Sequence, residues 1–144
     1  MAFDGSFGKA RHELIGCLGA GIFAHTLPSG DMLMDLPDFI KTFPALDVPF
    51  PDDVVKSYAI QSDKGLVVFF DFVKDMVLPP HSHLAQWGTV LDGEIEFTIA
   101  GETRVFGPGA IYDIPSGAEH GAIIKAGTKV IDVFEEPYRY ALRT

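Results

Sequence analysis

Cysteine and basic residues are both scarce in this sequence. The 144 residues include one cysteine, Cys17, which excludes an internal disulfide and fits a reducing compartment, so we expect a cytoplasmic protein. Lys and Arg number 11 against 20 Asp and Glu, which gives a net charge of -9. Nucleic acids and anionic membrane surfaces are bound by clustered Lys and Arg. We therefore expect neither of them as a partner.

Long hydrophobic runs are missing too. An apolar stretch near the N-terminus, LIGCLGAGIFA at residues 14–24, has 11 residues, against about 20 for a helix that spans a bilayer. Its LIGC tetrapeptide resembles a lipoprotein cleavage box, but such a box follows its apolar run, whereas GKARHE precedes this one. We expect these residues to belong to a packed N-terminal arm, and secretion is the alternative.

Several catalytic signatures are absent as well. The sequence has no Ser-His-Asp order, no phosphate-binding glycine loop and no Cys-x-x-Cys pair. Apolar residues are plentiful instead: a hydrophobic content of 47%, with twelve Phe, is too high for a disordered chain and sufficient for one domain with its own core. We expect a metal ion in such a domain to serve function and not folding.

Turn-forming residues divide the chain near residue 53. Prolines recur from Pro28 to Pro51, and they disfavour both long helices and central strands. This pattern predicts an N-terminal arm over residues 1–52, mostly extended, with one short helix over residues 37–42.

The pattern beyond residue 53 indicates an all-β domain. Short runs rich in Val, Ile, Phe and Tyr alternate with Gly, Pro and Asp at close spacing. They predict a single antiparallel β-barrel or jelly roll over residues 53–137, followed by a tail at residues 138–144. The predicted strands are residues 54–61, 66–74, 87–91, 94–99, 103–106, 110–114, 121–125 and 129–135.

Two histidines one residue apart stand in the segment PPHSH, at positions 81 and 83. If this segment is extended, both side chains leave the same face of one strand. A metal site requires that face to point into the barrel. The alternative is a pair of histidines that faces solvent, and the pair alone does not decide.

A second motif follows in the segment GAIYDIPSGAEHGAII. It runs from Gly109 over five residues to Pro-Ser-Gly, and over two more to His120. Together with His-x-His, Gln86, six residues and Gly93, it resembles the two conserved motifs of the cupin family. The two motif glycines lie 16 positions apart, a spacing typical of small bacterial cupins. The resemblance implies a barrel of the cupin, or RmlC-like, type.

The resemblance also implies that His81, His83 and His120 bind a metal ion. Gly93 suits a hairpin turn that needs positive φ, and the Pro-Ser-Gly turn sends the following strand back inward, so a closed barrel can bring the three rings together. Imidazoles with open coordination positions suit Fe, Mn, Ni, Cu, Co or Zn, whereas Ca and Mg prefer oxygen. We expect one divalent transition metal per chain.

Gln86 stands where the family usually has its fourth ligand, a Glu. An amide oxygen binds a divalent metal more weakly than a carboxylate and leaves the site one charge unit more positive, which favours an anionic substrate. Only two residues separate Gln86 from His83, where the family usually has three or four. A three-histidine site without Gln86 is therefore the alternative.

The end of the chain, VIDVFEEPYRY, is similar to the closing strand of many single-domain cupins. A subset with three His and one Gln opens unsaturated uronate sugars, and there a terminal Asp, Phe and Arg line the active site. The resemblance places these roles on Asp132, Phe134 and Arg139. The Arg comes one residue later than in that pattern, and Tyr138 stands in its place.

These residue types suit such chemistry, although each has a simpler alternative. An Asp beside a metal can act as general acid or base, and an Arg can bind a carboxylate through two hydrogen bonds. The alternative for Asp132 is a carboxylate capped by a backbone turn or paired with Lys129 on the surface. The alternative for Phe134 is a core residue. Arg139 is otherwise solvated or a dimer contact.

Trp87 and Tyr112 complete the expected substrate pocket together with Phe134. Trp87 follows Gln86 directly, and its alternative is a place on the outer face of the barrel under the arm. His12 and His25 lie in the arm, away from both motifs, and we expect neither to bind the metal.

These observations predict a metal-dependent enzyme of isomerase, lyase or dioxygenase type that acts on a small anionic metabolite. Uronate ring opening is the most concrete version. The alternative is a cupin that binds or senses a small molecule without turnover. An arm rich in Phe and Leu needs a surface to cover, so we also expect a homodimer.

Overall fold

The computed structural model describes residues 34–144, so the expectations for residues 14–24, Cys17, His12 and His25 lie outside the described residues. Within this part of the chain, no helix has the length and apolarity to cross a membrane. A short 3-10 helix, η1 (Ile40–Thr42), lies within the helix predicted for residues 37–42. The strands are β1 (Val55–Gln61), β2 (Leu66–Phe72), β3 (Met76–His81), β4 (Gln86–Asp92), β5 (Ile95–Ile99), β6 (Glu102–Phe106), β7 (Ile111–Ile114), β8 (His120–Ile124) and β9 (Lys129–Phe134).

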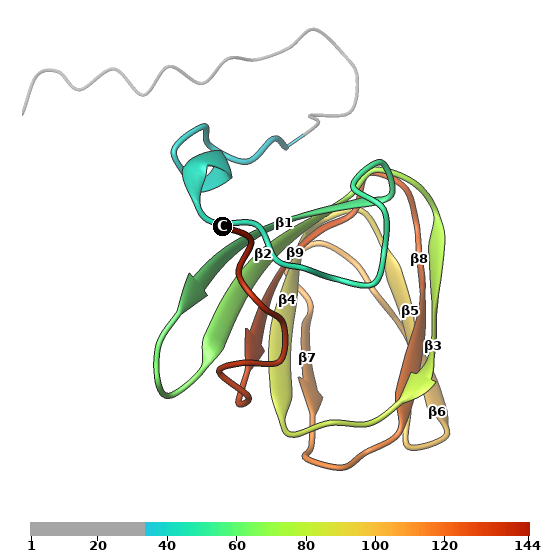
Figure 1. Ribbon diagram of the computed structural model, residues 1–144. Coiled ribbons are helices and arrows are strands. Elements are labelled where there is room, and N and C mark those ends of the chain that lie inside the picture. Colours follow the sequence, from blue (N-terminus) through green and yellow to red (C-terminus); the bar gives the residue numbers. More distant parts are fainter. Residues whose placement is uncertain (1–33) are drawn as a thin grey trace, which may run out of the picture. The chain divides into compact units, whose positions relative to one another are not determined.

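The strands form two antiparallel sheets that face each other, with the hydrophobic core between them (Figure 1). Strand order is β1-β2-β9-β4-β7 in the larger sheet and β3-β8-β5-β6 in the smaller one. From β3 onward the chain crosses repeatedly between the two sheets, which is the connectivity of a jelly roll. The predicted all-β fold is confirmed.

All eight predicted strands form, each within two residues of its predicted bounds. The sequence pattern missed β3, because this strand contains Pro79 and Pro80, which cannot donate to a strand ladder. The position of β3 explains why they are tolerated. It is an edge strand of the smaller sheet, so one side of its backbone has no strand to pair with.

Alternation along β9 decides which of its side chains enter the barrel. Val130, Asp132 and Phe134 are buried, and the residues between them are partly exposed. Successive side chains of a strand point to opposite faces, so Asp132 shares the inward face with two core residues. A charged residue type has therefore been placed in an apolar interior.

Residues 34–52, which belong to the predicted arm, pack with the strands in one compact unit that extends from residue 33 to residue 144. Leu46 is fully buried and forms a β-bridge with Leu142 of the predicted C-terminal tail. The Leu46 N–H donates to the Ser57 hydroxyl at 2.9 Å. Val48 and Phe50 reach the interior cluster. Arm and tail together thus cover one end of the core.

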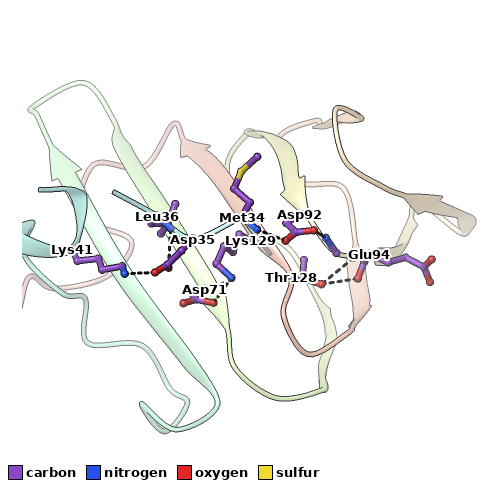
Figure 2. A network of polar contacts seen from close by, with 10 residues as sticks. Met34, Asp35, Leu36, Lys41, Asp71, Asp92, Glu94, Thr128 and Lys129 are labelled. Carbon is purple, nitrogen blue, oxygen red and sulfur yellow. Dashed lines mark hydrogen bonds and ion pairs between the residues drawn. The ribbon is translucent and has the colours of Figure 1, made fainter. Parts of the chain in front are cut away.

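Met34, the first described residue, is joined to the larger sheet by a polar contact, and further polar contacts lie within the arm and within the sheet (Figure 2). The Met34 N–H donates to the Asp92 carboxylate at 3.3 Å, and Lys41 pairs with Asp35 at 2.7 Å. Nearby, Lys129 and Asp71 form an ion pair of 3.4 Å between neighbouring strands β9 and β2, with both side chains mostly buried. Lys129 is therefore engaged by Asp71 and not by Asp132.

Gly93 lies in the turn between β4 and β5 with a φ of +82°, which confirms the predicted positive φ. The predicted hairpin is wrong, because β4 belongs to the larger sheet and β5 to the smaller one, so the turn leads the chain from one sheet to the other. The Asp92 carboxylate accepts the Gly93 N–H at 2.8 Å. A Cβ at Gly93 would lie 2.3 Å from Thr128 Oγ1, far inside contact distance. This turn therefore needs glycine for two reasons, its backbone conformation and its packing against Thr128.

A comparison of Gly93→Ala with Gly109→Ala separates the cost of the backbone conformation from the cost of the packing against Thr128. Gly109 has a φ of +83°, and an added Cβ there would meet no atom within 4 Å, so only the backbone strain applies. We expect Gly109→Ala to lower the free energy of unfolding by about 1 kcal/mol. Gly93→Ala should lower it by roughly 3 kcal/mol, because overpacking adds to the strain. Urea denaturation measures both, and equal losses would contradict the role of Thr128.

Candidate metal centre

Three imidazole rings converge at one end of the barrel interior. His81 ends β3 and His120 begins β8, and the two are direct cross-strand partners with ring centroids 4.3 Å apart. His83 lies in the loop between β3 and β4, with its ring centroid 5.3 Å from that of His81 and 4.6 Å from that of His120. One ring nitrogen from each of the three lies within 4.8 Å of the other two.

The turn of the second motif holds the loop that carries His83. The Gly117 N–H donates to the His83 carbonyl oxygen at 2.8 Å, and the Ala118 N–H donates to the Pro115 carbonyl oxygen at 3.1 Å. Gly117 adopts a φ of +79°, which suits glycine. The Pro-Ser-Gly turn therefore does two things: it leads the chain into His120 and ties down the loop of His83.

Each histidine of the triad has its Nδ1 beside a backbone carbonyl oxygen. A backbone carbonyl has only acceptor lone pairs, so an Nδ1 beside it carries a proton, and in the neutral ring Nε2 then holds the free lone pair. The carbonyl oxygens belong to Pro79, Leu84 and Ala118, at 2.9, 2.6 and 2.9 Å from Nδ1 of His81, His83 and His120 respectively. The protonation pattern is that of histidines that ligate a metal through Nε2.

The triad fits a transition-metal ion on its own geometry. His120 is only 2% exposed, and its Nε2 has no hydrogen-bond partner among the described residues. A buried polar atom left unpaired costs free energy, and a metal ion would satisfy it. Burial also lowers the pKa of His83 and of His120, so both rings are held in the neutral form that metal binding requires.

Gln86 faces the same interior space. It begins β4, its side chain is buried, and it lines a cavity together with His81 and His83. Its cross-strand neighbour on β9 is Phe134. The amide is therefore near enough to the triad to be a candidate for the fourth ligand.

The cavity between the two sheets has a volume of about 60 Å³. Space of this size holds a few water molecules and is well below the several hundred Å³ of a pocket for a drug-sized ligand. Its walls are mostly apolar, and the aromatic residues among them include Phe50, Phe70, Phe72, Phe97, Phe134 and Tyr140. The polar groups that enter it are thus few and surrounded by aromatic rings.

Asp132 is the one carboxylate among the residues that line this cavity. Burial raises its pKa to about 6, and hydrogen bonds from Tyr112 and from Gln86 oppose part of that effect. The Tyr112 hydroxyl donates to Asp132 Oδ1 at 2.6 Å. Burial raises the pKa of Tyr112 well above 10, so the phenol keeps its proton and remains the donor. The alternative of a surface pair with Lys129 is excluded.

Residues 73–134 match the family described as the Cupin domain, and this segment contains all three histidines, Gln86 and Asp132. The chain carries a cupin domain. No curated protein sequence matches the chain.

Several solved structures are similar to this chain. The structure of KdgF from Halomonas sp. is 28% identical to this chain, with 65% of this chain and 86% of that one covered and a TM-score of 0.57. An RmlC-like cupin from Shewanella frigidimarina is 24% identical, with 69% and 87% covered and a TM-score of 0.59. A deletion mutant of Bacillus subtilis oxalate decarboxylase is 16% identical, with 72% and 30% covered and a TM-score of 0.56. The last two show the fold alone.

Among the residues expected in the substrate pocket, Tyr112 and Phe134 line the cavity of this cupin domain, and Trp87 does not. Trp87 follows inward-facing Gln86 on β4, so the pleat turns it to the outer face, where it is 42% exposed. The expectation for Trp87 is corrected accordingly. Phe134 packs edge-on against His83, with ring centroids 5.7 Å apart.

Arg139 lies beside the cavity and not among the residues that line it. Its guanidinium carbon is 5.8 Å from the Phe134 ring centroid and 5.2 Å from that of Tyr140, within the range of a cation–π contact. One guanidinium nitrogen donates to the Glu136 carboxylate at 3.3 Å, and Nε is buried without a partner among the described residues. Its charge also lowers the pKa of His83, so it acts on the site electrostatically.

Two segments contribute cavity residues that the sequence reasoning missed. Tyr140 comes from the tail, and Val48 and Phe50 come from the arm. The only signal for Tyr140 was the aromatic spacing in EEPYRY, and nothing in the sequence indicated that the arm would reach the same space. Both segments owe their positions to the long-range bridge between Leu46 and Leu142.

The triad predicts metal binding that depends on His120. Protein purified without a metal-affinity column should contain about one transition metal per chain by elemental analysis. His120→Ala should lose it, because the two remaining rings leave a bidentate site, while His25→Ala serves as the matched control and should retain it. Equal metal content in His120→Ala and in the unchanged protein would contradict a site built on the triad.

Proposed function

We propose that this cupin domain binds one divalent transition metal through Nε2 of His81, His83 and His120, with the amide oxygen of Gln86 as fourth ligand. The convergence of three imidazoles, with one ring nitrogen from each within 4.8 Å of the others, supports the three nitrogen ligands. The buried position of Gln86 in the same cavity supports the oxygen ligand. The set contains nitrogen and a neutral oxygen, which favours Fe, Mn, Co, Ni, Cu or Zn over Ca or Mg.

We further propose that the domain is a metal-dependent enzyme for a small anionic metabolite, with ring opening of an unsaturated uronate as the concrete version. The observation that carries this proposal is the buried carboxyl of Asp132 in the same cavity as His81 and His83. A purely structural metal site does not need an ionisable group beside it. Four neutral ligands would also leave the charge of a divalent ion uncompensated, which favours an anion as substrate.

Each residue has a definite task in this proposal. A bound divalent metal supplies a Lewis acid that polarises a hydroxyl or carbonyl oxygen. Asp132 accepts or donates a proton at its carboxyl group, held by the Tyr112 hydroxyl in a space from which aromatic rings exclude bulk water. Arg139, whose Nε has no partner among the described residues, binds the carboxylate of the substrate. Phe134 forms the wall between them.

The size of the cavity favours a second candidate, a cupin that binds or senses a small ligand without turnover. At about 60 Å³ the space admits the reacting end of a metabolite and not a whole sugar ring. Dioxygenase chemistry on a small substrate is compatible with the same space. Only turnover of a defined substrate separates these possibilities from uronate ring opening.

An assay with unsaturated uronates tests the concrete version. Loss of their ultraviolet absorbance should be faster with metal-loaded protein than with buffer. Asp132→Asn should slow it at least about 100-fold through the loss of a proton-transfer group, while Lys64→Ala, at an exposed position outside the site, should not. Absence of any acceleration would remove the uronate version and leave the metal-binding proposal to its own test.

We also propose a homodimer that uses the outer face of the larger sheet. An apolar row crosses four strands there, because Ile60 pairs with Val67, Val67 with Val133 and Val133 with Trp87. Ile60 is 50% and Trp87 is 42% exposed. The row itself carries no charge in a chain with a net charge of -9, although Asp113 follows Trp87 on the next strand, so it offers two copies an apolar strip on which to meet.

Light scattering in solution tests the dimer. A dimer of the 15.7 kDa chain should give twice that mass, and Trp87→Lys should shift it toward the monomer. Val77→Lys provides the matched control, because Val77 is an even more exposed apolar residue but lies on the smaller sheet. A monomeric mass for the unchanged chain, or equal effects of the two substitutions, would contradict this interface.

A further inference from the structure

Three residues from three adjacent strands of the larger sheet form one row on the cavity face. Gly88 of β4 is the direct cross-strand partner of Tyr112 on β7 and of Asp132 on β9. Two strand spacings, about 10 Å in total, separate the backbones of Tyr112 and Asp132. Their side chains nevertheless meet in a hydrogen bond of 2.6 Å, so the tyrosine lies flat across the intervening strand.

The absence of a side chain at Gly88 makes this crossing possible. A Cβ there would lie 2.3 Å from Tyr112 Cε2 and 2.4 Å from Asp132 Oδ1. The tyrosine ring has no room to retreat, because Phe97 and Phe106 pack against it with centroid distances of 4.7 and 5.6 Å. The hydrogen bond therefore occupies a passage that only glycine leaves open.

Gln86 lies two residues before Gly88 on the same face of β4 and lines the same cavity as Asp132 on the neighbouring strand β9. The Gln86 amide also lowers the pKa of Asp132, as a hydrogen-bond donor to its carboxylate would. An ionised carboxylate oxygen can only accept, so an amide that bonds to Asp132 does so through its NH₂ group. The carbonyl oxygen of the amide then points away from Asp132. A flipped amide would bring two acceptors together and lose the hydrogen bond.

We propose that Tyr112 is a positioning residue of the metal centre: by holding Asp132 across Gly88, it keeps the carboxylate where it receives the Gln86 NH₂ group and so directs the Gln86 oxygen toward the three histidines. The effect passes from Tyr112 to Asp132 and from Asp132 to Gln86. Neither Tyr112 nor Asp132 needs to contact the metal. A metal ion takes an amide through its oxygen, so the orientation decides whether Gln86 is a ligand. This inference rests on the metal centre proposed above.

The hydroxyl group of Tyr112 is not needed to fill its buried position. A phenylalanine would fill the same space between Phe97 and Phe106, and the hydroxyl adds only the bond to Asp132. Removing it would leave Asp132 free to turn and Gln86 free to flip. Outer partners of this kind typically change metal affinity by roughly 10- to 100-fold when they are lost.

A double-mutant cycle on metal affinity tests the inference. Protein stripped with a chelator is titrated calorimetrically with Co²⁺ as four variants: unchanged, Tyr112→Phe, Gln86→Ala and both together. We expect Tyr112→Phe to weaken Co²⁺ binding at least about tenfold when Gln86 is present. With Ala at position 86 there is no amide to direct, so the same substitution should have no effect beyond about twofold.

A merely structural tyrosine would weaken binding equally in both backgrounds, and that result, or no weakening at all, would overturn the inference. If Tyr112→Phe does not fold, as judged by circular dichroism, Asp132→Asn takes its place in the cycle. An Asn side chain both donates and accepts, so it no longer dictates the orientation of Gln86. Failure of the unchanged protein to bind Co²⁺ would remove the metal centre itself, whereas an additive cycle would remove only the positioning role.

Discussion

An unpaired polar atom inside an apolar barrel costs free energy, and the polar groups between these two sheets are arranged around that cost. Each histidine of the triad gives its Nδ1 proton to a nearby backbone carbonyl oxygen, and Tyr112 gives its proton to Asp132. Two buried side-chain nitrogens remain without a partner among the described residues, Nε2 of His120 and Nε of Arg139. A cation would satisfy the first of these atoms, and a carboxylate would satisfy the second.

The sequence predicted those parts of the structure that depend on local pattern. Eight strands follow from alternation and turn residues, and the positive φ of Gly93 follows from the Asp-Gly turn. That this turn connects two sheets and not a hairpin did not follow from the pattern. The convergence of the histidines followed from the family resemblance, since 37 positions separate His83 from His120. Strand β3 escaped prediction because its prolines are acceptable only at a sheet edge, and edge status is a property of the assembled sheet.

Side-chain direction and long-range contact were beyond the reach of the pattern. Trp87 and Gln86 are adjacent, and only the pleat of β4 assigns one to the solvent and the other to the cavity. Both faces of the larger sheet are apolar, so hydrophobicity could not indicate which alternate residues of a strand face the cavity and which face the solvent. The bond between Tyr112 and Asp132 depends on a glycine in a third strand, and the cavity positions of Phe50 and Tyr140 depend on a bridge between arm and tail.

The glycine at position 88 has a consequence for how sequences of this type can diverge. Its lack of a side chain is required only while a tyrosine crosses above it to reach Asp132. A relative with a larger residue at this position must therefore have lost the crossing, and with it the reason to keep both the tyrosine and the aspartate. Gly88, Tyr112 and Asp132 should therefore be kept or lost together among homologues. The presence of all three would mark homologues that share this arrangement.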